Sequence, residues 1–447
     1  MSEDEPDHTP EDDFREILRE FLSGNSSTID ASKLAGAAGL PNDPQSIHQL
    51  LSQLQNALLN QSDEIDWTPA EQQARSIAGT GAREATPSER SSLEQSFHVA
   101  ALWLDEATGI TELSSTPELI GRAEWARQTM PLWIQLAEPV AVSIADALTR
   151  VLAEQAPEEL RSTLAGAGKM MRSVGGTLFA MQLGQVVGQL AREVVSGGDI
   201  GVPLLAEGTA ALLPQNTADF GEGLDIPVDQ VQLYLAVREL AHARLFRHAK
   251  WLRLQLITQI TTFARGITID TQRLESLAEN FDASNPEELR LAVVSGALIP
   301  PKTEQQQEAL ERLETMLALI EGWVDVVTAH ATRLLPRADA VAETVRRRRA
   351  AGGPAESAFA TLVGLELRPR RLREAAALWQ KITDTAGSEA RDALWAHPDL
   401  VPESTDIDDP TALLSRLGTT ATGNDPEQDD FDRALEDLLS NPDSDET

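Results

Sequence analysis

Residues 231–251 read VQLYLAVRELAHARLFRHAKW, and they are the most informative stretch of this 447-residue chain. Apolar side chains recur there at intervals of three and four residues, which predicts a helix, and their number predicts that the helix is largely buried. On a helical wheel Arg238, Glu239 and His242 share one arc, because they lie within about one turn. Titratable side chains on a buried helix need either buried partners or a cleft. The pattern alone leaves both interpretations open.

The segment Arg238-Glu239-Leu240-Ala241-His242 differs by one residue from the HExxH signature of zinc peptidases. In that signature two histidines one turn apart bind zinc, and the glutamate activates the metal-bound water. Arg238 stands where the first histidine would be, and a guanidinium cannot deprotonate to bind a cation. The segment therefore keeps Glu239 and His242 of the signature, while Arg238 argues against the metal.

Six stretches, the signature segment among them, make the chain resemble a known family. Together they span roughly residues 45–400, and they are AEWARQTMPLWIQLAEPV (123–140), DIGVPLLAEGTAALLPQN (199–216), LYLAVRELAHARLFRHAKWLR (233–253), FARGITID (263–270), ALIEGWVD (318–325) and VRRRRAAGGPAESAFATLVGLELRPRRLREAAALW (345–379). They resemble a bacterial family, common in actinobacteria, of zinc-dependent metalloproteases or hydrolases of the zincin-like superfamily. Members similar to this chain carry RExxH in place of HExxH. The resemblance implies a zincin-like core, metallopeptidase or hydrolase activity, and zinc as the cofactor.

The resemblance also implies roles for residues on a second helix. In glutamate-type zincins a downstream helix supplies a glutamate as the third zinc ligand, often followed four residues later by an aspartate that supports a ligand histidine. Glu321 and Asp325 are similar to that pair. By this resemblance Glu239 is the general base and His242 and Glu321 are two of three metal ligands. Catalytic zinc normally has three protein ligands, so Arg238 leaves a site without metal as the alternative.

Glu321 is expected to be buried, because it lies on the apolar stripe of a helix predicted over 303–334. A buried carboxylate needs a partner. If the family geometry is kept, the carboxylate that would meet zinc lies near a guanidinium instead. We therefore predict that Arg238 pairs with Glu321, Asp325 or both within salt-bridge distance.

The composition limits the class of protein. The formal net charge is −34, which disfavours nonspecific nucleic-acid binding, and the chain has no cysteine, which excludes disulfides and thiolate metal sites. The N-terminus, MSEDEPDHTPEDD, is the opposite of a signal peptide, and the longest uncharged run, residues 173–191, is too polar for a membrane span. We expect a soluble cytoplasmic protein.

Three regions are predicted along the chain. Residues 1–45 form an acidic flexible arm with one short helix, residues 46–400 a mostly helical, zincin-like domain, and residues 401–447 an acidic tail with a short amphipathic helix. The fold class is mainly α, with at most a small β element in residues 200–213, just before the signature helix. Either short helix could dock in a groove of this protein or of a partner.

Eight arginines cluster within 346–373 of an otherwise acidic chain, four of them consecutive at Arg346–Arg349. This cluster is interpreted either as a solvated helix face or as a dock for an acidic segment, such as the chain's own acidic tail. Arg346–Arg349 are expected to be exposed or paired with carboxylates. Two functions remain open: a metallopeptidase or hydrolase, or a non-catalytic member of the fold that binds or regulates a protein or peptide partner.

Overall fold

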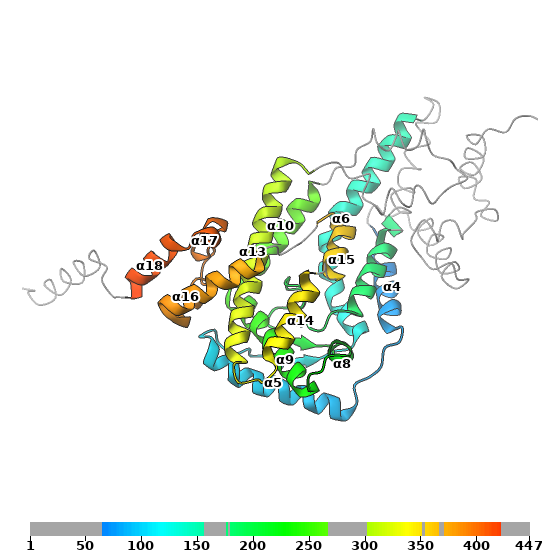
Figure 1. The fold of residues 1–447 in the computed structure, drawn as a ribbon. Coiled ribbons are helices and arrows are strands. Elements are labelled where there is room, and N and C mark those ends of the chain that lie inside the picture. Colours follow the sequence, from blue (N-terminus) through cyan, green and yellow to red (C-terminus); the bar gives the residue numbers. More distant parts are fainter. Residues whose placement is uncertain are drawn as a thin grey trace, which may run out of the picture.

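The computed structural model describes residues 65–155, 176–177, 179–266, 302–350, 354–365 and 371–421, and within them the fold is mainly α, as predicted (Figure 1). The helices are α4 (Thr68–Gly79), α5 (Pro87–Ala107), α6 (Arg122–Gln155), α8 (Pro214–Gly221), α9 (Val228–His248), α10 (Lys250–Arg265), α13 (Glu304–Ala331), α14 (Ala338–Ala350), α15 (Pro354–Val363), α16 (Leu372–Ala393), the 3-10 turn η2 (Pro398–Leu400), α17 (Ser404–Asp408) and α18 (Thr411–Ala421). The strands are β1 (Glu118–Leu119) and β2 (Ala211–Leu212).

Local capping fixes where the helices on either side of α9 begin. Thr86 and Glu89 form a capping box at α5, and Thr303 and Gln306 form one at α13. Each box satisfies backbone N–H groups that the first turn of a helix leaves without partners. The bounds of α4 and α5 are those of the helices that the apolar spacing predicts over 68–79 and 87–107.

The signature helix α9 lies at the centre of the packing. It contacts α5 and α13 along its length, and α8, α14 and β2 also pack on it (Figure 1). Nearly every residue from Val231 to Phe246 is buried, which confirms the expected burial. The helix predicted over 227–265 is, however, two helices, because Ala249 leaves the helical region with φ −93° and ψ 70°. No glycine or proline marks this break in the sequence.

The β element is a two-stranded parallel pair beside α9. β2 aligns with β1 in the register Glu118↔Ala211 and Leu119↔Leu212. β2 lies inside the range 200–213 where the sequence predicts a strand. The prediction of a helix from 116 to 127 was wrong for its first residues, because pairing with β2 overrides the local helix propensity there.

The folded chain continues past residue 400, where the acidic tail is predicted to begin. Val401, Ile407 and Leu413 are buried, and α17 and α18 pack on α16 (Figure 1). Acidic residues surround these apolar positions in the sequence, so the composition of the segment indicated an acidic tail. The predicted arm at 1–45 and the amphipathic helix near the C-terminus lie outside the described residues. Among the described helices, none is long and apolar enough to cross a membrane.

Candidate functional site

The site is built first from two facing helices, α9 and α13. Arg238 of α9 forms a salt bridge with Glu321 of α13, and its other terminal nitrogen lies 4.0 Å from Asp325 Oδ1. All three side chains are buried. The predicted pairing of Arg238 with this carboxylate pair is therefore confirmed.

His242 lies against the same carboxylate. Its Nε2 is 3.0 Å from Glu321 Oε1, and its Nδ1 is 3.1 Å from the main-chain oxygen of Arg238. Both neighbours are hydrogen-bond acceptors. A ring nitrogen that donates to an acceptor has no lone pair for a metal ion, so the ring in this position is held as a donor to Glu321.

The third helix of the site, α14, supplies arginines. Arg349 lies 2.6 Å from Glu321 Oε1, and Arg346 lies 2.9 Å from Asp325 Oδ2. Sequence reasoning predicted that Arg346–Arg349 could pair with carboxylates, and that part is confirmed, but it did not place them in the site. The available indication was spacing, because residues 346 and 349 share one face of a helix. Arg347 lies on the other side and is 79% exposed.

The charges of the network act on Glu321 in opposite directions. Burial would raise the pKa of this carboxyl, but Arg349, His242 and Arg238 together hold it well below its usual range. Burial lowers the pKa of the Arg349 guanidinium, with Glu321 opposing that effect. Glu321 is thus a buried carboxylate kept ionised by its surrounding cations.

Glu239, on the same helix, holds the loop before β2. Its Oε2 accepts the N–H of Gly198 at 2.7 Å, and its Oε1 accepts the N–H of Ala211 at 2.8 Å. Burial raises the pKa of the Glu239 carboxyl, and these backbone donors oppose that shift. Both oxygens of the residue expected to be the general base are therefore engaged in fixing main chain.

Glycines let that loop lie directly on the site. A Cβ at Gly198 would stand 2.8 Å from the Cβ of His242. Gly201 has φ +80°, a conformation that favours glycine, and a Cβ there would stand 2.7 Å from Glu321 Oε1. The carboxylate of Asp199, between them, forms a salt bridge with Arg348 at 3.4 Å. The loop thus closes the network from one side, and α14 secures it.

The residues present do not fit a zinc ion at this position. Arg238 cannot be a ligand, His242 directs Nε2 at Glu321, and two guanidinium groups and the imidazole already contact the Glu321 carboxylate. Catalytic zinc normally takes three protein ligands. In the part of the chain that is described, no group of three His, Cys, Asp or Glu side chains is arranged to hold a metal.

Comparison with known proteins agrees with the fold and with the sequence resemblance. The solved structure of a proposed hydrolase with a novel fold from Chloroflexus aurantiacus is similar, with a TM-score of 0.54 and 19% identity over 79% of this chain and 99% of that one. At this identity the likeness concerns the fold alone. No curated protein matches the chain. The profile of the zincin-like metallopeptidases matches residues 65–414, well over half of the sequence, and the chain therefore belongs to the zincin-like metallopeptidase family.

Proposed function

We propose that this chain is a member of its family that holds no zinc at the His242–Glu321 position, that it is inactive as a zinc peptidase, and that it acts by binding a protein or peptide partner. One observation carries the proposal. The carboxylate expected to be a zinc ligand is contacted by Arg238, Arg349 and His242 at once. In this view the guanidinium group of Arg238 in RExxH takes the place of the metal cation that HExxH binds.

Electrostatics supports this reading. Zinc bound at Glu321 would have to displace two guanidinium groups that would keep their charge, one on the buried Arg238 and one on Arg349, whose side chain is 14% exposed. A buried cation separated from its counter-ion is costly, and the cost rises when a divalent cation is placed beside it. The ion-pair network therefore competes with the metal for the same carboxylate.

The position of Glu239 points the same way. A general base must reach the water that it deprotonates. Each Glu239 oxygen already accepts a backbone N–H of the loop that covers the site, from Gly198 and from Ala211. In the proposal Glu239 has a structural role and holds this loop in place.

The competing hypothesis is a working metallopeptidase in which these arginines move aside. A protease assay with unstructured casein, with and without added zinc, separates the two. We expect no hydrolysis above that of the Glu239→Ala variant. Zinc-dependent hydrolysis that is lost in both Glu239→Ala and His242→Ala would contradict the proposal.

A reconstructed site tests the assigned cause. The double variant Arg238→His/Arg349→Gln offers two imidazoles one turn apart and frees Glu321 from both guanidinium groups. Equilibrium dialysis should show zinc binding by the double variant that neither single variant reaches. If Arg238→His alone binds one zinc per chain, Arg349 does not block the metal and its place in the argument is wrong.

A further inference from the structure

A small cavity opens beside the site, between the loop before β2 and the junction of α9 with α10. Its volume is about 40 Å³, which is room for a few atoms, since one water needs about 10–15 Å³ measured in the same way. Glu239, Phe246, Lys250 and Arg253 are among the side chains that line it. His242 of the ion-pair network also lines the cavity, whereas Arg238, Glu321 and Arg349 do not.

Arg253 differs from the arginines of the network. Arg238, Arg346 and Arg349 each contact a carboxylate, whereas Arg253 donates only to the main-chain oxygen of Leu205. Within the described ranges no carboxylate lies within salt-bridge distance of its guanidinium. The group is half-buried, and burial lowers its pKa, with Glu207 opposing. A partly desolvated guanidinium that lacks a counter-ion is a receptor for an anion.

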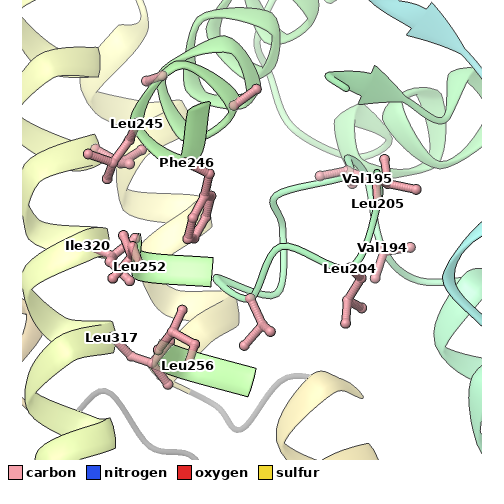
Figure 2. Close-up of a cluster of buried hydrophobic side chains, with 14 of the residues drawn as sticks. Val194, Val195, Leu204, Leu205, Leu245, Phe246, Leu252, Leu256, Leu317 and Ile320 are labelled. Carbon is pink, nitrogen blue, oxygen red and sulfur yellow. The ribbon is translucent and has the colours of Figure 1, made fainter. Parts of the chain in front are cut away.

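The surroundings strengthen that attraction. Figure 2 shows Phe246 at the end of α9 and Leu205 on the loop across from it, and both line the cavity together with Pro203 and Ala243. Apolar walls lower the local dielectric, so an ion pair formed there is stronger than one in water. The cavity therefore favours a charged group that can reach Arg253.

Lys250 adds a second cation at the rim. It lies 3.3 Å from Glu207, and both side chains are more than half exposed. An exposed pair of this kind contributes little stability, so it opens easily. Glu239 brings the opposing charge, but both its oxygens already accept backbone N–H bonds.

We propose that this cavity binds a carboxylate group, with Arg253 as the anchor and Lys250 at the entrance. The volume admits the carboxylate and excludes a whole side chain, so the rest of the ligand lies outside the cavity. A terminal carboxylate of a peptide and a small free carboxylate share this chemistry. The inference goes beyond the proposed function, because its anchor, Arg253, lies outside the ion-pair network.

Calorimetric titration of the intact protein in the presence of a chelator tests the site. The probes are sodium acetate, the tripeptide Ala-Ala-Phe with a free C-terminus, and its C-terminal amide. Arg253→Gln removes the anchor. Lys250→Gln changes an exposed side chain, and this substitution is not expected to affect folding. Arg247→Gln is the matched control, because Arg247 is also half-buried and donates to a main-chain oxygen, that of Glu112, but lines a different surface.

We expect acetate and the free tripeptide to bind the wild type, with affinity reduced at least about tenfold by Arg253→Gln, less by Lys250→Gln, and unchanged by Arg247→Gln. A peptide that binds more tightly than acetate and far more tightly than its amide identifies a peptide terminus as the ligand. Equal binding of acetate and peptide identifies a small carboxylate. Absence of binding by both carboxylates, equal binding of peptide and amide, or equal affinity in Arg253→Gln overturns the proposal.

Discussion

Two buried carboxylates on neighbouring helices, Asp392 and Glu321, are stabilised by different sets of partners. Asp392 of α16 meets one cation, Arg391, and three neutral donors: the Thr108 hydroxyl at 2.6 Å, the Gly109 N–H at 2.9 Å and the Trp323 indole N–H at 2.9 Å. Glu321 of α13 meets two guanidinium groups and an imidazole. Asp392 is balanced one charge to one, as expected for a structural ion pair in a core.

The difference lies in the number of cations for each carboxylate. A structural pair needs only one, because neutral donors satisfy the remaining lone pairs. Glu321 instead has an excess of cationic donors, at the position that the sequence resemblance predicts to be a metal ligand. This contrast indicates that Glu321 lies in an environment of strong positive charge, and arginines supply that charge in this chain.

The largest expected effect comes from removing the carboxylates. Glu321→Gln removes the carboxylate that contacts Arg349 and leaves Arg238 with Asp325 alone, 4.0 Å away, whereas Asp392→Asn removes the counter-ion of one guanidinium group, that of Arg391. Breaking a buried pair costs about 3–5 kcal/mol, and we expect the loss for Glu321→Gln to be the greater of the two. Urea denaturation of both variants measures the free energies of unfolding. An equal or larger loss in Asp392→Asn would remove the contrast.

Removing the cations should reverse the order. Arg391→Met leaves Asp392 with no cation and should cost about 3–5 kcal/mol. Arg238→Met leaves Glu321 with Arg349 and His242, so its cost should resemble the loss of one charged hydrogen bond, about 1.5–3 kcal/mol. The same denaturation experiment decides, and an Arg238→Met variant that is less stable than Arg391→Met would show that Arg349 and His242 do not compensate.

The pH dependence of the Glu321→Gln effect sharpens the contrast further. Cations hold the pKa of folded Glu321 well below its unfolded value of about 4.3. A lowered folded pKa gives stability that is full above the unfolded pKa and is lost as pH falls toward the folded pKa. The gap in unfolding free energy between wild type and Glu321→Gln should therefore be constant from pH 7 to about 5 and shrink below about 4. A gap that stays unchanged down to pH 3 contradicts this assignment.

The smallest effect separates neighbours on α14. Arg347 is 79% exposed and pairs with Glu343 one turn away, so Arg347→Gln should change stability by less than about 0.5 kcal/mol. Arg349→Gln removes a buried contact to Glu321 and should cost clearly more. Thermal denaturation of the two variants at equal concentration compares them, and an equal shift in Tm would place Arg349 outside the network.

Local patterns in the sequence predicted the parts of this account that lie within single helices. The apolar spacing predicted the buried helix α9, the inward position of Glu321 and the helix over 87–107, which is α5. The pairing of Arg238 with Glu321 followed from the family resemblance combined with the rule that buried charges need partners.

The remaining parts depend on tertiary contacts. In the sequence, Arg346 and Arg349 belong to a basic run that is expected to be either exposed or paired with carboxylates. The site was not predicted to include them, because nothing in their own segment shows that α14 packs on α9. The Glu239 carboxylate accepts hydrogen bonds from Gly198 and Ala211, which lie 41 and 28 residues away in the chain. Docking of an acidic tail on Arg346–Arg349 stays a prediction, and all four of these arginines already contact carboxylates of the folded domain.

Zinc stoichiometry of the unmodified protein is the most direct test of the central claim. The full chain is equilibrated with micromolar zinc, separated from free metal by gel filtration, and measured for zinc per chain beside the His242→Ala variant. The account predicts no zinc that depends on His242, because Arg238 and Arg349 hold Glu321. One zinc per chain in the wild type, lost in His242→Ala, would show that the site binds metal and that the guanidinium groups give way to it.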